Sequence, residues 1–244
     1  MGEFHRKVIL LKYIMEWGIL QEAKKMRQKG YRCLVGLDEA GRGPLAGPVV
    51  AAAVVAAEDK LPRRDFRKIK DSKKLSPKQR EEFYKIIVGC PCLKWGIGRV
   101  SEKTIDRINI LEATKLAMAK ALKNLNSKLR QENSGRTRRI DCLILDGNFF
   151  LPVEFLARAA VNPSVFQKPI VKADEKVFSC MAASIIAKVS RDRIMEKYHR
   201  RYPDYGFNRH KGYPTGFHFR MLKKYGRCAI HRKSFYGSSK TKTY

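Results

Sequence analysis

Residues 33–56 read CLVGLDEAGRGPLAGPVVAAAVVA. The first part is apolar from Cys33 to Leu37 and then meets Asp38 and Glu39. The chain breaks at the GRGP turn, residues 41–44, and becomes apolar again from Val49 onward. Short apolar runs bounded by Gly and Pro are typical of buried strands. The pattern therefore predicts two adjacent strands joined by a glycine-rich turn, with acidic residues at the end of the first strand.

Two other apolar segments also lead to an acidic residue. Residues 140–145 precede Asp146, and residues 166–172 precede Asp174. A helix N-cap or a turn would explain one such acid, but three coincident cases in a chain with 23 Asp and Glu weaken that reading. A cluster of carboxylates is costly unless a cation neutralises it. We therefore expect a single cation site made by four acids: Asp38, Glu39, Asp146 and Asp174.

The ligand type favours particular ions. Carboxylates without His or Cys partners suit Mg²⁺ or Mn²⁺ better than Zn²⁺. Two such ions roughly 4 Å apart can activate a water on one side of a phosphorus and stabilise the departing 3′ oxygen on the other. The predicted chemistry is phosphodiester hydrolysis with two divalent ions.

The net charge indicates the partner. The chain has 52 Lys and Arg against 23 Asp and Glu, a formal charge of +29, which favours a polyanion. Nucleic acid fits better than a membrane surface, because the basic residues are spread along the whole chain. The longest apolar stretch, residues 45–57, contains a Pro and is shorter than the roughly 20 residues that span a bilayer. Two alternatives stay open: a basic RNA-binding protein without chemistry, and a recombinase or transposase that acts on DNA without ribose.

The cysteines and the N-terminus indicate the compartment. None of the cysteines has the CxxC spacing of a structural zinc site, and the pair in Cys90-Pro91-Cys92 is too close for one. We expect all six to be reduced. At the N-terminus, Glu3, Arg6 and Lys7 precede an amphipathic pattern, whereas a signal peptide would have an apolar stretch and a cleavage site of small residues. A cytoplasmic protein is predicted.

The remaining periodicity predicts an α/β chain in three parts: an N-terminal helix (1–30), a catalytic domain (31–200) and a basic helical cap with its tail (201–244). Further elements are expected as follows: helices over 78–87, from Ser101 onward, over 153–160 and from Asp174 to about Arg200, a strand over 93–100, and a loop over 127–139.

Residues 36–49, GLDEAGRGPLAGPV, resemble the signature of bacterial ribonuclease HII, a type 2 ribonuclease H. The likeness spans residues 31 to 236 and continues, in order, in DSKKL (71–75), NI (109–110) to Thr114, DGN (146–148), KAD (172–174), AASIIAKV (182–189), RD (191–192), KGYPT (211–215) and HRKSF (231–235). The resemblance implies a ribonuclease H-like α/β fold, with a mixed central sheet flanked by helices and a small C-terminal helical extension. The related type HIII enzymes usually have a lysine in place of Arg42 and an extra N-terminal platform domain. Residues 1–30 are too few for such a platform, so type HII is preferred.

The resemblance also implies an activity. It is that of a monomeric, metal-dependent endonuclease, which cuts 5′ of ribonucleotides in RNA–DNA hybrids and in duplex DNA and serves in primer removal and ribonucleotide repair. The family's metal-binding acids match Asp38, Glu39, Asp146 and Asp174.

Several substrate contacts are implied in the same way. Gly41, Arg42 and Gly43 match the turn that reads the ribose 2′-OH, and glycines do let a backbone come close to a sugar. Tyr213 matches a tyrosine that stacks on the sugar of the following deoxynucleotide. The plainer readings are an ordinary hairpin turn and a surface-packed ring.

Three more residues are assigned to phosphate. Lys73 and Lys74 suit phosphate contacts, although lysines in a basic loop are usually only solvated. Ser184 either reaches a phosphate or is a small residue at a helix interface. Asp192, between two arginines on a helix, is explained by an ordinary ion pair.

Overall fold

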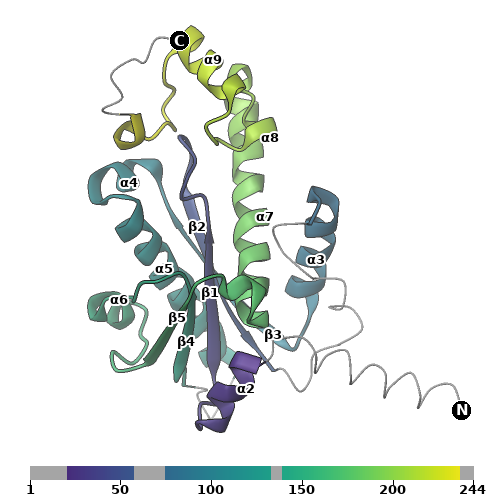
Figure 1. The fold of residues 1–244 in the computed structure, drawn as a ribbon, viewed down its shortest axis with the longest axis vertical. Coiled ribbons are helices and arrows are strands. Elements are labelled where there is room, and N and C mark those ends of the chain that lie inside the picture. The colour runs from purple at the N-terminus through teal and green to yellow at the C-terminus, as the bar shows by residue number, and fades with distance from the viewer. Residues whose placement is uncertain (1–20, 58–74, 133–138, 237–244) are drawn as a thin grey trace, which may run out of the picture.

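The computed structural model describes residues 21–57, 75–132 and 139–236. Its centre is a mixed five-stranded sheet in the order β3-β2-β1-β4-β5 (Figure 1). β1 pairs antiparallel with β2 and parallel with β4, while β2–β3 is antiparallel and β4–β5 parallel. The strands are β1 (Leu34–Ala40), β2 (Val49–Ala56), β3 (Leu93–Val100), β4 (Cys142–Asp146) and β5 (Phe166–Ile170). The predicted mixed sheet and its strands are confirmed.

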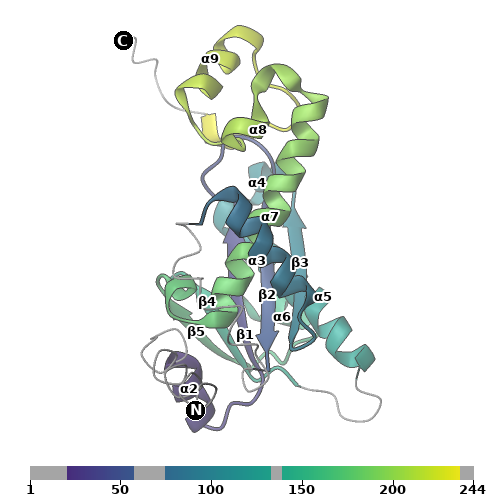
Figure 2. The same ribbon diagram turned by 90° about the vertical axis from the view of Figure 1, so that its right-hand side faces the viewer.

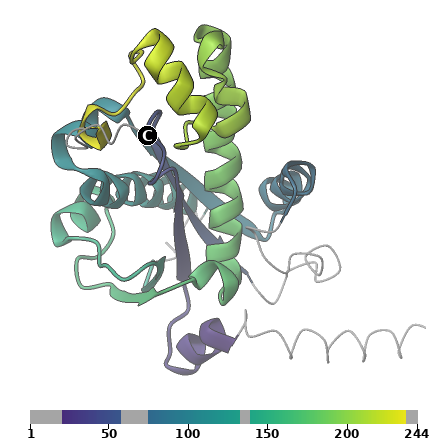
Figure 3. The ribbon, with the colours of Figure 1, turned by 45° about the horizontal axis from the view of Figure 1, so that its top comes forward.

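Helices cover both faces of this sheet. α5 (Ile110–Glu132) packs on β2 and β3 on one side, and α7 (Phe178–Arg201) packs on β1 and β2 on the other (Figure 3). Glycines let these helices come close: a Cβ on Gly36 would lie 2.4 Å from the Cys180 backbone nitrogen of α7. On the other face, a Cβ on Gly98 would lie 2.0 Å from the Ala117 carbonyl of α5. With helices on both faces, β2 is buried along its whole length.

The helix predicted after Ser101 is interrupted. α4 (Glu102–Ile108) ends at Asn109, whose φ of 65° is left-handed, and α5 starts at the next residue. The Asn109 side chain then accepts hydrogen bonds from the N–H groups of Leu111 and Glu112, which caps α5. One residue therefore ends one helix and begins the next, which a pattern of apolar spacing does not reveal.

The loop predicted over 127–139 was wrong in its first part, because α5 continues to Glu132. Leu129 is buried and extends the apolar face of the helix, next to Leu125. The Asn126 amide donates to the carbonyls of Ala159 and Ala160. Polar residues do not by themselves indicate a loop: Lys, Arg, Gln and Glu are good helix formers, and these tertiary contacts hold the last turns of α5 in place.

The part of the chain after α7 lies beyond one end of the sheet, and α2 (Gln21–Gln28) lies at the other (Figure 2). The C-terminal part packs against the loop between β1 and β2, where Ala46 forms a bridge with His231. The elements of this C-terminal part are η4 (Pro203–Tyr205), α8 (Phe207–His210), α9 (Gly216–Tyr225) and η5 (Lys233–Tyr236). The remaining elements are α3 (Pro77–Gly89), α6 (Val153–Arg158) and η3 (Ala173–Glu175).

Two expectations on smaller features can be compared with the structure. The helix predicted over 78–87 is confirmed as α3, which Ser76 caps with a capping box and in which Pro77 occupies the first turn. Cys90 and Cys92 form a disulfide, so the expectation that all six cysteines are reduced was wrong for this pair. The bend between α3 and β3 brings their Cα atoms to 5.3 Å, within the usual range for a bridge. Among the described helices, none is both long and apolar enough to cross a membrane.

Candidate active site

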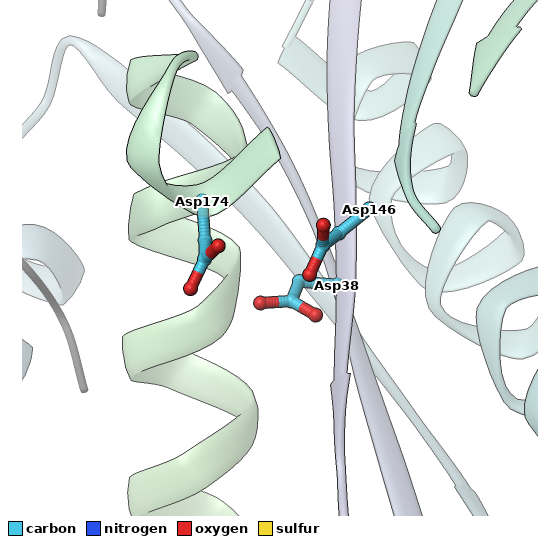
Figure 4. Close-up of side chains that lie close together, drawn as sticks. All are labelled: Asp38, Asp146 and Asp174. Carbon is cyan, nitrogen blue, oxygen red and sulfur yellow. The ribbon is translucent and has the colours of Figure 1, made fainter. Parts of the chain in front are cut away.

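Three carboxylates from separate parts of the chain meet beside the sheet (Figure 4). Asp38 stands in β1, Asp146 ends the neighbouring parallel strand β4, and Asp174 lies in η3, just before α7. Each offers an oxygen that lies within 4.8 Å of the oxygens of the other two. The parallel pairing of β1 and β4 carries the first two acids to the same end of the sheet. We refer to Asp38, Asp146 and Asp174 as the acidic group.

The surroundings of the acidic group make it costly without a cation. Asp38 and Asp174 are buried, with 4% and 1% of their surface exposed. Burial raises the pKa of Asp38 well above its usual value, and the charges of Glu39, Asp146 and Asp174 raise it further. Oxygen donors gathered in this way suit a hard divalent ion, which would remove both penalties. The acidic group therefore fits a metal site.

Glu39 follows Asp38 on β1 but is not one of the three carboxylates of the acidic group. Its backbone N–H donates to the Asp38 carboxylate at 2.6 Å. Its own carboxylate lies 3.4 Å from the Arg42 guanidinium, in the turn. It remains close enough for its charge to raise the pKa of Asp38. The structure thus brings together three of the four predicted acids and places Glu39 at their edge, toward the turn.

Ser184 contacts the acidic group directly. Its hydroxyl donates a hydrogen bond to Asp38, which favours the ionised carboxylate and opposes the rise in its pKa. This contact from α7 was not foreseen from the sequence. Asp192, on the same helix, pairs with Lys188 at 2.8 Å, so the predicted ordinary ion pair is confirmed, although with a different partner from the flanking arginines.

The glycine-rich turn and Tyr213 lie side by side. A Cβ on Gly43 would be 3.7 Å from the Tyr213 ring, which is 39% exposed. Gly41 has a φ of 100°, in the left-handed region that favours glycine. Arg42 and Gly43 are exposed. The exposed part of the predicted ribose-reading turn, Arg42 and Gly43, therefore forms one continuous surface with the Tyr213 ring, and Glu39 lies between this surface and the acidic group.

A model of the family named Ribonuclease HII matches residues 35–237. The chain belongs to the ribonuclease HII family. A ribonuclease HII of Chlamydia muridarum is 45% identical over 230 residues, which is 92% of this chain and 94% of that protein. The chain is thus a ribonuclease H enzyme, as the resemblance implied.

Solved structures agree on the fold. Ribonuclease HII of Archaeoglobus fulgidus, solved in complex with PCNA, has a TM-score of 0.64 at 27% identity, over 86% of this chain and 98% of that chain. Ribonuclease H2 of Pyrococcus horikoshii has a TM-score of 0.61 at 30% identity, over 83% of this chain and 93% of that chain. The predicted ribonuclease H-like fold is confirmed.

Two arginines of this ribonuclease HII chain were missed by the sequence reasoning as individual residues. Arg191 and Arg232 are 0% and 1% exposed, and each donates three hydrogen bonds to backbone carbonyls around the turn. Arginine is seldom buried, so residue type gives no signal for such a role. Lys73 and Lys74 lie outside the described residues.

Two buried histidines, His218 and His231, form a chain of hydrogen bonds that ends at the backbone carbonyl of Tyr213. The Cys228 N–H donates to Nδ1 of His231 at 2.9 Å, so in the neutral ring the proton sits on Nε2. That Nε2 lies 3.0 Å from Nε2 of His218, which must accept and therefore carries its own proton on Nδ1. The Nδ1 of His218 in turn donates to the Tyr213 carbonyl at 2.9 Å. Burial lowers the pKa of His218 to about 4, so the neutral form assumed in this chain of bonds is the one present near neutral pH.

Proposed function

We propose that this enzyme hydrolyses the phosphodiester on the 5′ side of ribonucleotides, both in RNA–DNA hybrids and at ribonucleotides embedded in duplex DNA. The observation that carries the proposal is the position of the acidic group next to the continuous surface of the Gly41–Gly43 turn and Tyr213. The residues proposed to act on the phosphate and those proposed to recognise the ribose are then next to each other. The same proposal gives the enzyme a cytoplasmic role in primer removal and ribonucleotide excision repair, acting as a monomer.

The residues that would hold two Mn²⁺ or Mg²⁺ ions are Asp38, Glu39, Asp146 and Asp174. Three of them form the acidic group, and Glu39 lies beside Asp38. The chemistry that such ions supply is activation of a water and neutralisation of charge on the departing 3′ oxygen. The protein supplies the site's charge and shape, and the Ser184 hydroxyl holds Asp38 by a hydrogen bond.

The turn and the ring would select the substrate. The turn of Gly41, Arg42 and Gly43 would meet the 2′-OH, the group that separates ribose from deoxyribose, through the backbone of its two exposed residues, Arg42 and Gly43, with Gly41 buried behind them. A site built to hydrogen-bond a hydroxyl penalises its absence, because its partners are then left unpaired. Tyr213 would stack on the sugar of the following nucleotide, and Lys73 and Lys74 would contact phosphates. Scission would leave a 3′-hydroxyl and a 5′-phosphate.

The decisive experiment uses a DNA duplex with a single ribonucleotide, incubated with Mn²⁺, with Mg²⁺ and with EDTA. We expect cutting only on the 5′ side of the ribonucleotide and only with a divalent ion. An all-DNA duplex of the same sequence is the control, and equal cutting of it would refute the proposal in favour of a DNA nuclease. Tight binding with no cutting under any condition would indicate a basic nucleic-acid-binding protein instead.

A further inference from the structure

Two buried guanidinium groups hold the glycine-rich turn from behind. Arg232 donates to the carbonyls of Gly41, Arg42 and Gly47, at 2.6, 2.9 and 2.9 Å. Arg191, on α7, donates to the carbonyls of Pro48, Ala46 and Lys211, at 3.0, 3.1 and 3.0 Å. All but one of these acceptors lie in residues 41–48, between β1 and β2, and Lys211 lies two residues before Tyr213. Neither arginine has a part in the chemistry described above.

The contacts of Arg232 determine which way the turn presents its backbone. A trans peptide is planar, and its C=O and N–H point in opposite directions. Because Arg232 binds the carbonyls of Gly41 and Arg42, the N–H groups of Arg42 and Gly43 point away from Arg232. Arg42 and Gly43 are the exposed residues of the turn, and Gly43 adjoins the Tyr213 ring, so donors that point away from the buried Arg232 are available to a sugar bound beside that ring.

The contacts of Arg191 couple the turn to Tyr213. One guanidinium bridges the 41–48 loop and the segment that carries the tyrosine, and the Leu45 N–H donates to the Gly212 carbonyl at 2.8 Å in parallel. The guanidinium carbon also lies 5.8 Å from the centre of the Tyr213 ring. Gly41 fits against this side chain only because it has no Cβ, which would lie 2.1 Å from Nε of Arg191.

We propose that Arg191 and Arg232 are positioning residues for ribose recognition. Together they orient the peptides of the Gly41–Gly43 turn and fix the position of that turn relative to Tyr213. This inference rests on the proposed function. A planar fork that serves three carbonyls at once cannot be replaced by the single ammonium of lysine. The role therefore predicts a loss of discrimination even in variants that keep the positive charge.

The test compares Arg232→Met, Arg232→Lys and Arg191→Lys with the wild type. Leu125→Ala is the control, because Leu125 belongs to α5, is fully buried between that helix and the face of the sheet opposite α7, and its truncation lowers stability without touching the turn. For each protein the melting temperature is measured first. Affinity in EDTA is then measured for a duplex with one ribonucleotide and for the same duplex entirely of DNA, and single-turnover cleavage is measured in Mn²⁺.

We expect each arginine variant to lose about tenfold or more in the ratio of the two affinities and in cleavage rate, with its affinity for all-DNA duplex unchanged. Leu125→Ala should keep the ratio despite its lower melting temperature. Should Arg232→Met fail to fold, the lysine variants carry the same test, since they keep the charge and the aliphatic stem.

The inference is overturned if a folded arginine variant discriminates as well as the wild type, or if Leu125→Ala loses discrimination to the same extent. A wild-type protein that binds and cuts both duplexes equally would overturn the proposed function, and this inference with it. The two failures are thus distinguished by the behaviour of the wild type.

Discussion

The Oδ1 atom of Asp146 accepts a hydrogen bond from the backbone N–H of Ala173 at 2.8 Å. This bond ties the end of β4 to η3, directly before Asp174. One carboxylate therefore both belongs to the acidic group and holds another member of it in place. Its structural and chemical contributions can be separated by substitution.

Asp146→Asn should abolish cleavage while leaving the fold intact, because the amide oxygen can still accept from Ala173. Asp146→Ala should abolish cleavage and be less stable than Asp146→Asn by about 1 kcal/mol, the usual contribution of such a bond, because both variants remove the same charge and only the alanine also removes the acceptor. Cleavage of a duplex with one ribonucleotide and chemical denaturation measure the two effects. Equal stability of the two variants would show that the bond to Ala173 contributes nothing.

Asp38→Asn should stabilise the protein when no metal is present. The substitution replaces a buried carboxylate, which its acidic neighbours disfavour, by a neutral amide of the same shape. Thermal melting in EDTA should therefore give a higher midpoint than the wild type, and added Mn²⁺ should raise the midpoint of the wild type more than that of the variant. Turnover should be lost while nucleic-acid affinity is largely kept. A lower midpoint in EDTA, or a large loss of affinity, would contradict this account.

Tyr213→Phe should keep most of the preference for a ribonucleotide duplex, whereas Tyr213→Ala should weaken binding by roughly 1 kcal/mol, because the sugar loses the apolar ring face on which it packs. The ring is exposed and adjoins the turn, so its face is available to a sugar. Fluorescence anisotropy with the two duplexes measures the effect. If both variants lose affinity equally, the phenolic hydroxyl rather than the ring face is responsible.

Stability should fall as the pH decreases from about 6.5 to about 4. Burial lowers the pKa of His218 to about 4 in the folded protein, against 6.5 as the ordinary value. The unfolded chain then binds a proton in this window that the folded chain does not, so stability is full above pH 6.5 and decreases below it. For this one residue the loss is on the order of 3 kcal/mol.

His218→Gln, which does not titrate, isolates this contribution. The free energies of unfolding of the two proteins, measured by denaturation at several pH values, should converge as the pH falls. Only the wild type loses the stability that neutral His218 contributes. Curves that stay parallel between pH 6.5 and pH 4 would show that His218 is protonated equally in the folded and unfolded states.

Nucleic-acid affinity should decrease steeply with salt, because a protein with a formal charge of +29 releases many counterions on binding. A loss of about 10³-fold or more between roughly 50 and 200 mM salt corresponds to six or more phosphate contacts. Titrations at several salt concentrations give the slope. A flat profile would mean that the charge serves a partner other than nucleic acid.

Much of this architecture could be predicted from local sequence patterns. Apolar runs bounded by turn residues predict β1 and β2. Acids that follow strands predict Asp38, Asp146 and Asp174 as neighbours, because parallel strands bring their ends to the same edge of a sheet. Such patterns depend on residues that are close along the chain.

The contacts that only the folded chain reveals join distant residues. Arg232 meets the Gly41 carbonyl across 191 positions of sequence, and Arg191 meets that of Ala46 across 145. A backbone carbonyl is present at every residue, so residue type does not indicate which carbonyl a buried guanidinium will bind. Likewise, Asn109 separates α4 from α5, and Leu129 keeps the end of α5 helical, because of conformation and packing that arise only once the sheet and its helices are assembled.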